Sequence, residues 1–310
     1  MDVSICITTY NHEKYISECL LSVLNQNFDG SFEIIVCNDN STDATEKAIF
    51  AVKESHPKGS CIRYYNNTPN LGYVKNTLHS FNLAQGKYVA VLDGDDYFID
   101  SKKLQKQFDF LEQNNNFSAV GGDSLVIYED TDQPDHQFSR HVNRELSHED
   151  LTDIKIMQTS TLFFRKDILK PDFPTDILSA DRCLYLLAGC YGKIKILPET
   201  LSSYRQFAAS LSKNVTYETM KKDFAIIPFI LKYGKHYRPS SLKTYFYYTL
   251  MAYSKSMTLK QFNSAARGYL INNTLSKFSF NPLKLYHTLK WGAHTVKQKY
   301  HLKKQNNSFV

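Results

Sequence analysis

Strand-like and helix-like segments alternate through the first 115 residues, and this alternation constrains the fold more than any other feature of the chain. Short segments rich in apolar residues, as expected for strands, occur at residues 3–8, 32–37, 61–65 and 88–92. The stretches between them carry helical spacing of apolar residues or capping residues. Such alternation is typical of a parallel sheet whose strands are joined by right-handed crossover helices.

Three crossover helices are predicted between these strands. Asn11 is the expected N-cap of the first, whose apolar face carries Tyr15, Ile16, Cys19, Leu20, Val23 and Leu24. The polar segment 40–43 is expected to open the second helix, and residues 78–84 are expected to lie on the third.

Three carboxylates surround one glycine directly behind the fourth predicted strand, at Asp93, Gly94, Asp95 and Asp96. In a parallel sheet the loops that follow the strands share one edge, where open α/β sheets bind ligands. Residues 8–13, Asp39 and the acidic segment are therefore expected to converge. Oxygen ligands gathered at one edge predict a divalent cation site, whereas an isolated segment of this kind would be an ordinary acidic turn.

Phosphate-binding glycine loops are missing from the sequence. Neither GxGxxG after the first strand nor GxxxxGK[ST] occurs, so dinucleotide binding and a Walker-type phosphate loop are not indicated. A bound diphosphate would need a cation on the Asp cluster and a basic side chain. Lys75 is a candidate for that side chain, with a solvated helix lysine as the alternative. Asp39 could accept hydrogen bonds from a nucleobase or cap the next helix, and the sequence favours neither.

Charge is distributed unequally along the 310 residues. The formal net charge is +6, yet residues 211–310 contain 17 Lys and Arg against only Glu218 and Asp223. Residues 1–210 therefore carry an excess of negative charge. The chain has an acidic body and a basic tail, and it is long enough for one large domain or two smaller ones.

The cysteines and the apolar segments bear on localisation. The six cysteines show no CxxC spacing and no clustering, which favours buried thiols in a reducing compartment. No basic leader with an apolar core precedes the first strand. The longest apolar run, 224–231, contains Pro228 and is too short to span a bilayer. Cytoplasmic localisation is the expectation.

Five short motifs follow one another in the amino-terminal part. They are ITTYNHE at 7–13, NDNSTD at 38–43, NLGYVKN at 70–76, AQGKY at 84–88 and DGDD at 93–96. In this order they resemble the inverting family 2 glycosyltransferases with the GT-A fold. The resemblance is strong to about residue 115 and weaker to about residue 210. It implies a Rossmann-like, mostly parallel α/β sheet flanked by helices, with a C-terminal helical extension.

The resemblance also implies an activity, a site and a cofactor. The chain would transfer a hexosyl or N-acetylhexosaminyl group, with inversion, from a nucleotide-diphosphate sugar, with uridine diphosphate as the expected carrier. The acceptor hydroxyl would belong to a carbohydrate or lipid-linked saccharide in cell-surface polysaccharide or glycolipid synthesis. The implied nucleotide-sugar site comprises Thr8, Tyr10, Glu13, Asp39, Lys75, Asp93, Gly94 and Asp95. Asp95 and Asp96 are the implied ligands of Mn²⁺ or Mg²⁺, which would stabilise charge on the leaving diphosphate.

Asp181 is the predicted general base that deprotonates the acceptor. It lies where a helix is expected to begin, and the family carries its catalytic acid in a similar segment, usually after Glu or Gly rather than Ala180. The alternative is an Asp that stabilises the first helical turn through the helix dipole. Many family members have His at the position of Phe207, and this departure puts a His-assisted metal site in doubt.

The predicted catalytic domain spans 1–210, with a nucleotide-sugar half at 1–115 and an acceptor half at 116–210. Within the acceptor half, 128–153 is expected to be a solvated loop. The spacing of its histidines suits no tight metal site; they are His136, His141 and His148. Residues 211–310 are predicted to be helical, basic and aromatic-rich.

Three interpretations of the basic tail remain open. The first is peripheral contact with an anionic membrane, at the inner face of the cell membrane, through lysines and aromatic residues. The aromatic residues are Tyr245, Tyr247, Phe246, Tyr248, Phe262, Tyr269, Phe278, Phe280, Tyr286 and Trp291. The second is packing against the acidic body. The third, nucleic-acid binding, is not expected because no recognised motif supports it.

Two other classes of function also fit parts of the sequence. One is another metal-dependent phosphoryl or nucleotidyl enzyme, although phosphatases with an Asp-x-Asp nucleophile and nucleotidyltransferases place their motifs behind the first strand. This chain has Thr8, Thr9, Tyr10 and Asn11 there. The other is a non-catalytic binder of sugars or lipid head groups that kept the fold.

Overall fold

The computed structural model describes residues 1–310 apart from 139–141, 153–156, 208–214, 256, 278–281 and 306–310. The chain forms two compact units. The first comprises Met1–Ser147, Lys155–Thr175 and Leu187–Phe207, and the second comprises His148–Ile154, Asp176–Leu186 and Ala208–Val310. The chain therefore passes between the units more than once.

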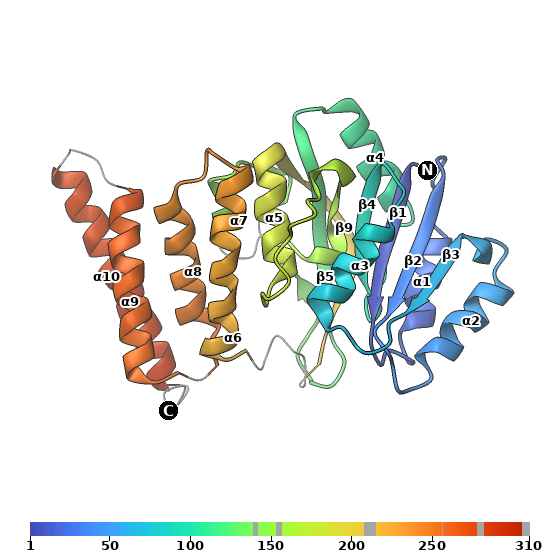
Figure 1. The fold of residues 1–310 in the computed structure, drawn as a ribbon, viewed down its shortest axis with the longest axis horizontal. Coiled ribbons are helices and arrows are strands. Elements are labelled where there is room, and N and C mark those ends of the chain that lie inside the picture. Colours follow the sequence, from blue (N-terminus) through green and yellow to red (C-terminus); the bar gives the residue numbers. More distant parts are fainter. Residues whose placement is uncertain (139–141, 153–156, 208–214, 256, 278–281, 306–310) are drawn as a thin grey trace. The chain divides into compact units, whose positions relative to one another are not determined.

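A single sheet in the first unit contains all the strands that the structure describes. Its order is β3-β2-β1-β4-β8-β5-β9-β7, and β6 pairs with β5. The strands are β1 Val3–Thr9, β2 Phe32–Asn38, β3 Ile62–Asn66, β4 Tyr88–Asp93, β5 Phe117–Tyr128, β6 His136–Gln137, β7 Arg144–Leu146, β8 Phe163–Arg165 and β9 Lys193–Gln206. Together with the flanking helices (Figure 1), this sheet confirms the predicted mostly parallel α/β fold.

The parallel half of the sheet is built from the four predicted strands. β1 pairs in parallel with β2 and β4, and β2 pairs in parallel with β3. The other half is mixed, since β8 runs antiparallel to β4 and β5, while β5 and β9 are parallel with bulges in their register. Sequence alternation indicated only the parallel half.

The crossover helices of the first unit are α1 Ile16–Leu24, α2 Thr45–Ser55, α3 Tyr73–Leu83 and α4 Lys103–Gln113. The predicted N-cap of the first helix is wrong: α1 has Tyr15 as its N-cap. Asn11 has a φ of 57°, a left-handed conformation that Asn tolerates, and its Oδ1 accepts a hydrogen bond from the Thr42 backbone N–H at 2.8 Å. Asn11 thus joins two loops at the sheet edge.

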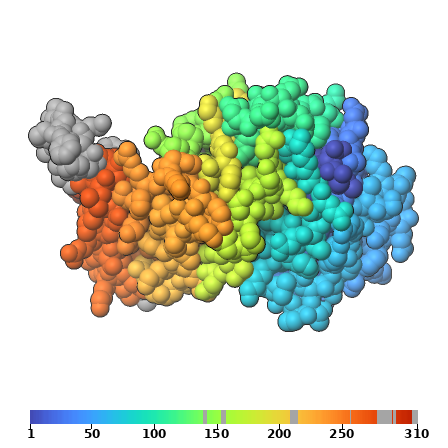
Figure 2. Space-filling view, turned by 45° about the horizontal axis from the view of Figure 1, so that its top comes forward, coloured from blue at the N-terminus to red at the C-terminus, as the bar shows by residue number. Residues whose placement is uncertain are grey.

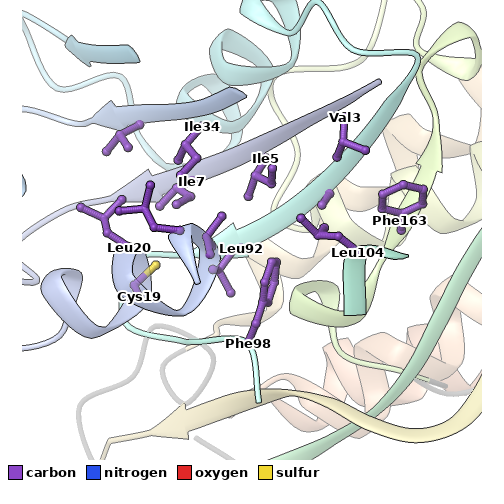
Figure 3. Packing of buried hydrophobic residues seen from close by; sticks show 14 of the residues in the cluster. Val3, Ile5, Ile7, Cys19, Leu20, Ile34, Leu92, Phe98, Leu104 and Phe163 are labelled. Atoms are coloured by element: carbon purple, nitrogen blue, oxygen red, sulfur yellow. The ribbon is translucent and has the colours of Figure 1, made fainter. Parts of the chain in front are cut away.

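Side chains of β1 alternate between the two faces of the sheet, as a pleated strand requires. Val3, Ile5 and Ile7 are fully buried in a cluster that includes residues of α1 and α4 (Figure 3). Cys6 points to the opposite face, where its Sγ lies 3.4 Å from the carbonyl oxygen of Ser80 in α3. Because helices cover both faces of the sheet, side chains on both faces of the central strands are buried. This explains why the central strands consist largely of consecutive apolar residues.

The second unit is helical. Its helices are α6 Tyr217–Lys221, α7 Ile226–Tyr233, α8 Pro239–Tyr253, α9 Leu259–Ser276 and α10 Pro282–Gln305, and α5 Ala180–Tyr191 begins in this unit and ends in the first. Both α6 and α9 start with capping boxes, at Thr216 and Thr258, which satisfy backbone N–H groups of the first turn.

Several aromatic residues that the sequence assigned to membrane contact form the core of the second unit. Tyr245, Phe246, Phe262 and Tyr269 are each at most 7% exposed. Burial of these large rings stabilises the packing of α8 and α9, so these four cannot serve as interfacial residues and that part of the expectation is wrong. The side chains of Phe278, Phe280, Tyr286 and Trp291, like His141 of the predicted loop, lie outside the described residues.

No described helix combines the length and the hydropathy needed to cross a bilayer.

Lys103, the first residue of α4, is fully buried in the first unit. Its Nζ donates to Gln107 Oε1 at 2.7 Å and lies 4.1 Å from the ring centre of Phe98. Burial, opposed by the charge of Asp100, lowers the pKa of Lys103 from 10.5 to about 7. Between these two pH values the unfolded chain binds a proton that the folded chain lacks, so the folded state gains stability as pH rises through this window.

Lys103→Met is expected to raise the free energy of unfolding at pH 7 by about 2 kcal/mol, because removing the burial cost of the charge outweighs the lost bond to Gln107. The variant should also lose the rise in stability above pH 7. Urea denaturation at neutral and alkaline pH measures both, with the exposed Lys102→Met as control. A Lys103→Met protein that keeps the wild-type pH dependence would contradict this account.

Candidate active site

The loops that follow β1, β2 and β4 meet at one edge of the sheet, as predicted. Thr8 of β1 lies opposite Asp93 of β4, and Thr9 lies opposite Asn38 of β2. Backbone hydrogen bonds extend these pairings into the loops, from Asp39 N–H to the Thr9 carbonyl oxygen at 2.9 Å and from the Gly94 N–H to the Thr8 carbonyl oxygen at 2.8 Å. The acidic segment and the first two loops therefore form one continuous edge.

The three carboxylates of the acidic loop, residues 93–96, differ in their exposure and in their hydrogen bonds. Asp93 Oδ1 accepts a hydrogen bond from Thr8 Oγ1 at 3.0 Å. Asp95 is half-buried, and its Oδ2 lies 3.8 Å from His12 Nε2, with each of these two side chains 23% exposed. Asp96 is buried and its Oδ1 accepts from the Arg205 backbone N–H at 2.7 Å. Of the two predicted metal ligands, Asp95 is thus the accessible one, and ligation by Asp96 stays a prediction.

Negative charge is concentrated in this loop. Burial, with the added charges of Asp95 and Asp93, raises the pKa of the Asp96 carboxyl well above its usual range. Like charges held this close disfavour each other's ionised forms. A cation at the loop would relieve that repulsion.

Arg205, at the end of β9, ties the acidic loop to the rest of the first unit. Its Nη1 donates to the Asp95 carbonyl oxygen at 2.5 Å, its Nε to Glu129 Oε1 at 2.6 Å and its Nη2 to Glu18 Oε2 at 2.5 Å. The guanidinium also lies 5.0 Å and 4.8 Å from two ring centres, those of Tyr15 and Tyr97. The planar, five-donor head of Arg suits such a junction, which sequence reasoning did not identify.

Arg205→Gln is expected to lower the free energy of unfolding by about 2 kcal/mol, because the carboxylates of Glu129 and Glu18 lose the buried cation that pairs with them. Glu18 is half-exposed, so water offsets part of this loss there. Chemical denaturation measures this change. Arg205→Lys keeps the charge but not the directed bonds, so an intermediate loss is expected for it. Wild-type stability in the Gln variant would refute the role of Arg205 as a junction.

His12 is a second residue that sequence reasoning missed. Its Nδ1 is buried and, within the described part of the chain, has no hydrogen-bond partner. A Cβ at Gly94 would lie 2.9 Å from this nitrogen and 2.7 Å from Thr9 Oγ1. Gly94 therefore allows the acidic loop to pack directly against the first loop. His12 belongs to the ITTYNHE motif, but the motif alone does not show that its ring faces Asp95.

The acidic loop fits a divalent cation when part of the coordination comes from a ligand. Among the described residues, no group of three His, Cys, Asp or Glu side chains is arranged to hold a metal ion. Mg²⁺, however, is commonly held by one or two carboxylates together with substrate phosphates. The accessible Asp95 carboxylate supplies such a partial set, and the excess negative charge around it favours cation binding.

Asp39 is almost completely buried behind the second loop. Its Oδ1 accepts from the Asn67 side chain and from the Leu71 backbone N–H, and its Oδ2 accepts from the Gly72 N–H at 2.8 Å. Gly72 is the N-cap of α3 and has a φ of 81°. Asp39 thus organises the start of α3 and does not cap α2, whose N-cap is Ala44. One acceptor position on Oδ2 remains for a nucleobase.

The remaining predicted residues of the donor site lie on the first loop and at the start of α3. Glu13 Oε2 accepts from the Ala44 N–H at 2.8 Å, which links the first loop to the start of α2. Tyr10 is 47% exposed, and Lys75 is exposed on the first turn of α3. Phe207 packs against Tyr15 with ring centres 5.4 Å apart. The contacts of Glu13, Tyr10 and Lys75 with a donor stay predictions.

Asp181 belongs to the second unit and lies in the first turn of α5. Its Oδ1 accepts from the Arg182 backbone N–H at 2.8 Å, so the helix-stabilising alternative remains open. Arg182 is fixed by hydrogen bonds from Nη1 to Asp223 Oδ2 at 2.7 Å and from Nε to the Tyr245 hydroxyl at 3.0 Å. These bonds order the segment that carries Asp181, and its role as a base stays a prediction.

Comparison with known proteins identifies the family. The model of glycosyl transferase family 2 matches residues 4–173. An uncharacterized protein of Mycobacterium tuberculosis is 31% identical over 206 residues, which are 66% of this chain and 59% of that protein. A poly(ribitol-phosphate) beta-glucosyltransferase of Bacillus spizizenii is 31% identical over 201 residues, 63% of this chain and 30% of that one. The match thus spans less than two thirds of these relatives.

Solved structures share the fold at low sequence identity. TarS 1–349 of S. aureus in complex with UDP-GlcNAc has a TM-score of 0.67 and 19% identity, over 97% of this chain and 92% of that chain. A mannosyltransferase from Pyrobaculum calidifontis in complex with GDP-Man and Mn²⁺ has a TM-score of 0.58 and 15% identity, over 99% of this chain and 84% of that chain.

Proposed function

Because the chain belongs to glycosyl transferase family 2, we propose that it transfers a sugar from a nucleotide-diphosphate sugar to an acceptor hydroxyl. The observation that carries this proposal is the convergence of three loops at one sheet edge. There the buried Asp39 and the accessible Asp95 offer sites for a nucleobase and for a cation-bound diphosphate. Ligands of open α/β sheets bind at such an edge.

The donor is a hexose or N-acetylhexosamine linked to uridine diphosphate in this proposal. The free acceptor position on Asp39 Oδ2 would receive the N–H of the base, while Thr8, Tyr10 and Glu13 border the nucleoside. Lys75 would contact the diphosphate from the first turn of α3. The structure of TarS with UDP-GlcNAc, which shares the fold, supports the choice of nucleotide.

Departure of the diphosphate requires charge stabilisation at the acidic loop. Asp95 would hold a Mn²⁺ or Mg²⁺ ion, with Asp96 as the second predicted ligand and Asp93 beside them. When bound, the cation acts as a Lewis acid that stabilises negative charge on the departing oxygens. Arg205 holds the loop in place through the Asp95 carbonyl oxygen, and the presence of Mn²⁺ in the structure of the mannosyltransferase supports the assignment.

Asp181 would accept the proton of the acceptor hydroxyl. The acceptor oxygen then bonds to the anomeric carbon while the bond between that carbon and the diphosphate oxygen breaks on the opposite side, which inverts the configuration. A positioned carboxylate base contributes roughly 10²- to 10⁴-fold in rate. The acceptor is proposed to be a carbohydrate or a lipid-linked saccharide of cell-surface polysaccharide or glycolipid synthesis. We place the reaction in the cytoplasm, at the inner face of the membrane.

A thermal-shift screen of nucleotide sugars, each with and without Mn²⁺, tests the donor assignment. A ligand that binds only the folded state raises the unfolding temperature, so uridine-linked sugars are expected to stabilise the protein more strongly with Mn²⁺ than without it. Stabilisation by free sugars alone would identify a non-catalytic binder. No response to any nucleotide sugar would contradict the proposal.

A further inference from the structure

The last acidic residue of the chain is Asp223. Residues 224–310 contain 14 Lys and Arg and neither Asp nor Glu. A helical region that only packed on itself would be expected to balance its surface charge with both signs. The complete exclusion of carboxylates over this length therefore indicates a surface that meets negative charge.

The inner side of α10 is identified by its contacts within the second unit. Tyr300 packs against Phe262 of α9 with ring centres 5.8 Å apart, and Lys299 Nζ lies 5.0 Å from the ring centre of Tyr248. Lys303, buried on the same side, donates to the carbonyl oxygen of Ser254. These contacts fix which side of α10 faces the unit's core.

The outer side of α10 carries a stripe of basic and titratable residues. Successive members are four or three positions apart and so lie along one side of the helix. They are all exposed: Lys290, His294, Lys297, His301 and Lys304. We call these five residues the basic stripe.

Exposed apolar side chains also occur on α9 and α10. Leu302, which follows His301 of the stripe, is 49% exposed. On the outer side of α9, Ile271 and Leu275 are 50% and 58% exposed and lie one turn apart, with the exposed Arg267 one turn before them. Figure 2 shows atoms of α9 in orange-red at the surface. Large aliphatic side chains left in water next to lysines are typical of surfaces that enter the head-group region of a bilayer.

We propose that the outer surfaces of α9 and α10 dock on an anionic lipid bilayer. The basic stripe supplies the electrostatic attraction, since each Lys near such a surface contributes about 1 kcal/mol. Leu302, Ile271 and Leu275 insert between the head groups. A nucleic acid or another polyanion would match the charge but would leave these aliphatic side chains in water, so the lipid surface fits both features. This inference does not rest on the proposed transfer reaction.

Flotation of the full chain with lipid vesicles tests this surface. The wild type is expected to float with phosphatidylcholine vesicles that contain phosphatidylglycerol and to stay behind with pure phosphatidylcholine, and high salt should weaken its binding. Replacing Lys290, Lys297 and Lys304 by Glu is expected to lower the affinity by at least about a hundredfold.

Two controls keep the result specific. The matched triple replacement of Lys47, Lys58 and Lys102 by Glu, in the first unit, changes the net charge equally and is expected to leave binding close to that of the wild type. Leu302→Ser is expected to weaken vesicle binding without affecting binding to polyphosphate. Absence of flotation, an equal loss in both triple variants, or vesicle binding that Leu302→Ser leaves unchanged would overturn the proposal.

Discussion

Asp95→Asn is expected to lower sugar transfer by about 10²- to 10³-fold, which is the scale of removing one group that stabilises charge on a leaving oxygen. The replacement removes the accessible charge of the acidic loop but preserves the size of the side chain. The Asp95 carboxylate lies 3.8 Å from His12 Nε2, which is longer than a hydrogen bond, so the fold should tolerate the amide. Release of nucleoside diphosphate, measured over a range of Mn²⁺ concentrations, quantifies the loss.

Asp109→Asn, on the exposed surface of α4, is the matched control for Asp95→Asn. It makes the same chemical change within the first unit but away from the sheet edge. It should transfer sugar at the wild-type rate with the wild-type Mn²⁺ dependence. If Asp95→Asn behaved like this control, Asp95 would have no part in metal or diphosphate binding.

Asp181→Asn is expected to lower the rate of transfer by roughly 10²- to 10⁴-fold, while binding of donor and Mn²⁺ remains intact. The amide cannot accept the acceptor's proton, yet its oxygen can still receive the Arg182 N–H that Asp181 receives at 2.8 Å. Calorimetric titration with a nucleotide sugar measures the binding, and product formation measures the chemistry.

The neighbouring Asp176 offers the control for this second variant. It belongs to the same unit and its side chain is 84% exposed, in an ion pair with Lys222. Asp176→Asn should therefore lose little stability and no activity. A wild-type transfer rate in Asp181→Asn would leave only the helix-stabilising role, and lost donor binding would point to misfolding of the segment.

The parallel half of the sheet could be predicted from the sequence because its strands and connecting helices follow one another directly along the chain. Each of its strands is rich in apolar residues, each crossover helix follows directly, and right-handed connection places the loops on one side. The meeting of Thr8 with Asp93 follows from that topology alone. The same reasoning found the acidic loop and the second loop with Asp39, because short polar segments after buried strands are visible in the sequence.

The residues that hold the loops of the site in place could not be predicted, because their contacts join positions that are far apart in the sequence. Arg205 reaches Glu18 across 187 positions and Asp95 across 110. Its sequence neighbourhood gives no sign of either contact. The hydrogen bond that the Gly72 N–H donates to Asp39 likewise depends on how α3 begins. The antiparallel insertion of β8 between β4 and β5 leaves no periodic signal in the sequence.

In the basic tail, the charge excess could be seen in the sequence, but the residues that form the surface of the helices could not. Its charge excess is a property of the sequence, but the sequence does not tell which aromatic rings face water. The structure buries Tyr245, Phe246 and Phe262 and leaves Ile271, Leu275 and Leu302 exposed instead. These three aliphatic residues belong to the surface that we propose docks on a lipid bilayer. The predicted division of the chain at residue 210 stays a prediction.

Phosphorus NMR of a reaction mixture distinguishes glycosyl transfer from other cleavage reactions, because it reports which bond of the nucleotide sugar breaks. With Mn²⁺ and an acceptor present, we expect nucleoside diphosphate to accumulate and chelation of the metal to stop this accumulation. Nucleoside monophosphate with sugar phosphate would show cleavage between the two phosphates, as in a nucleotidyl or phosphoryl enzyme. That result, or an intact nucleotide sugar with every acceptor tried, would contradict metal-assisted glycosyl transfer.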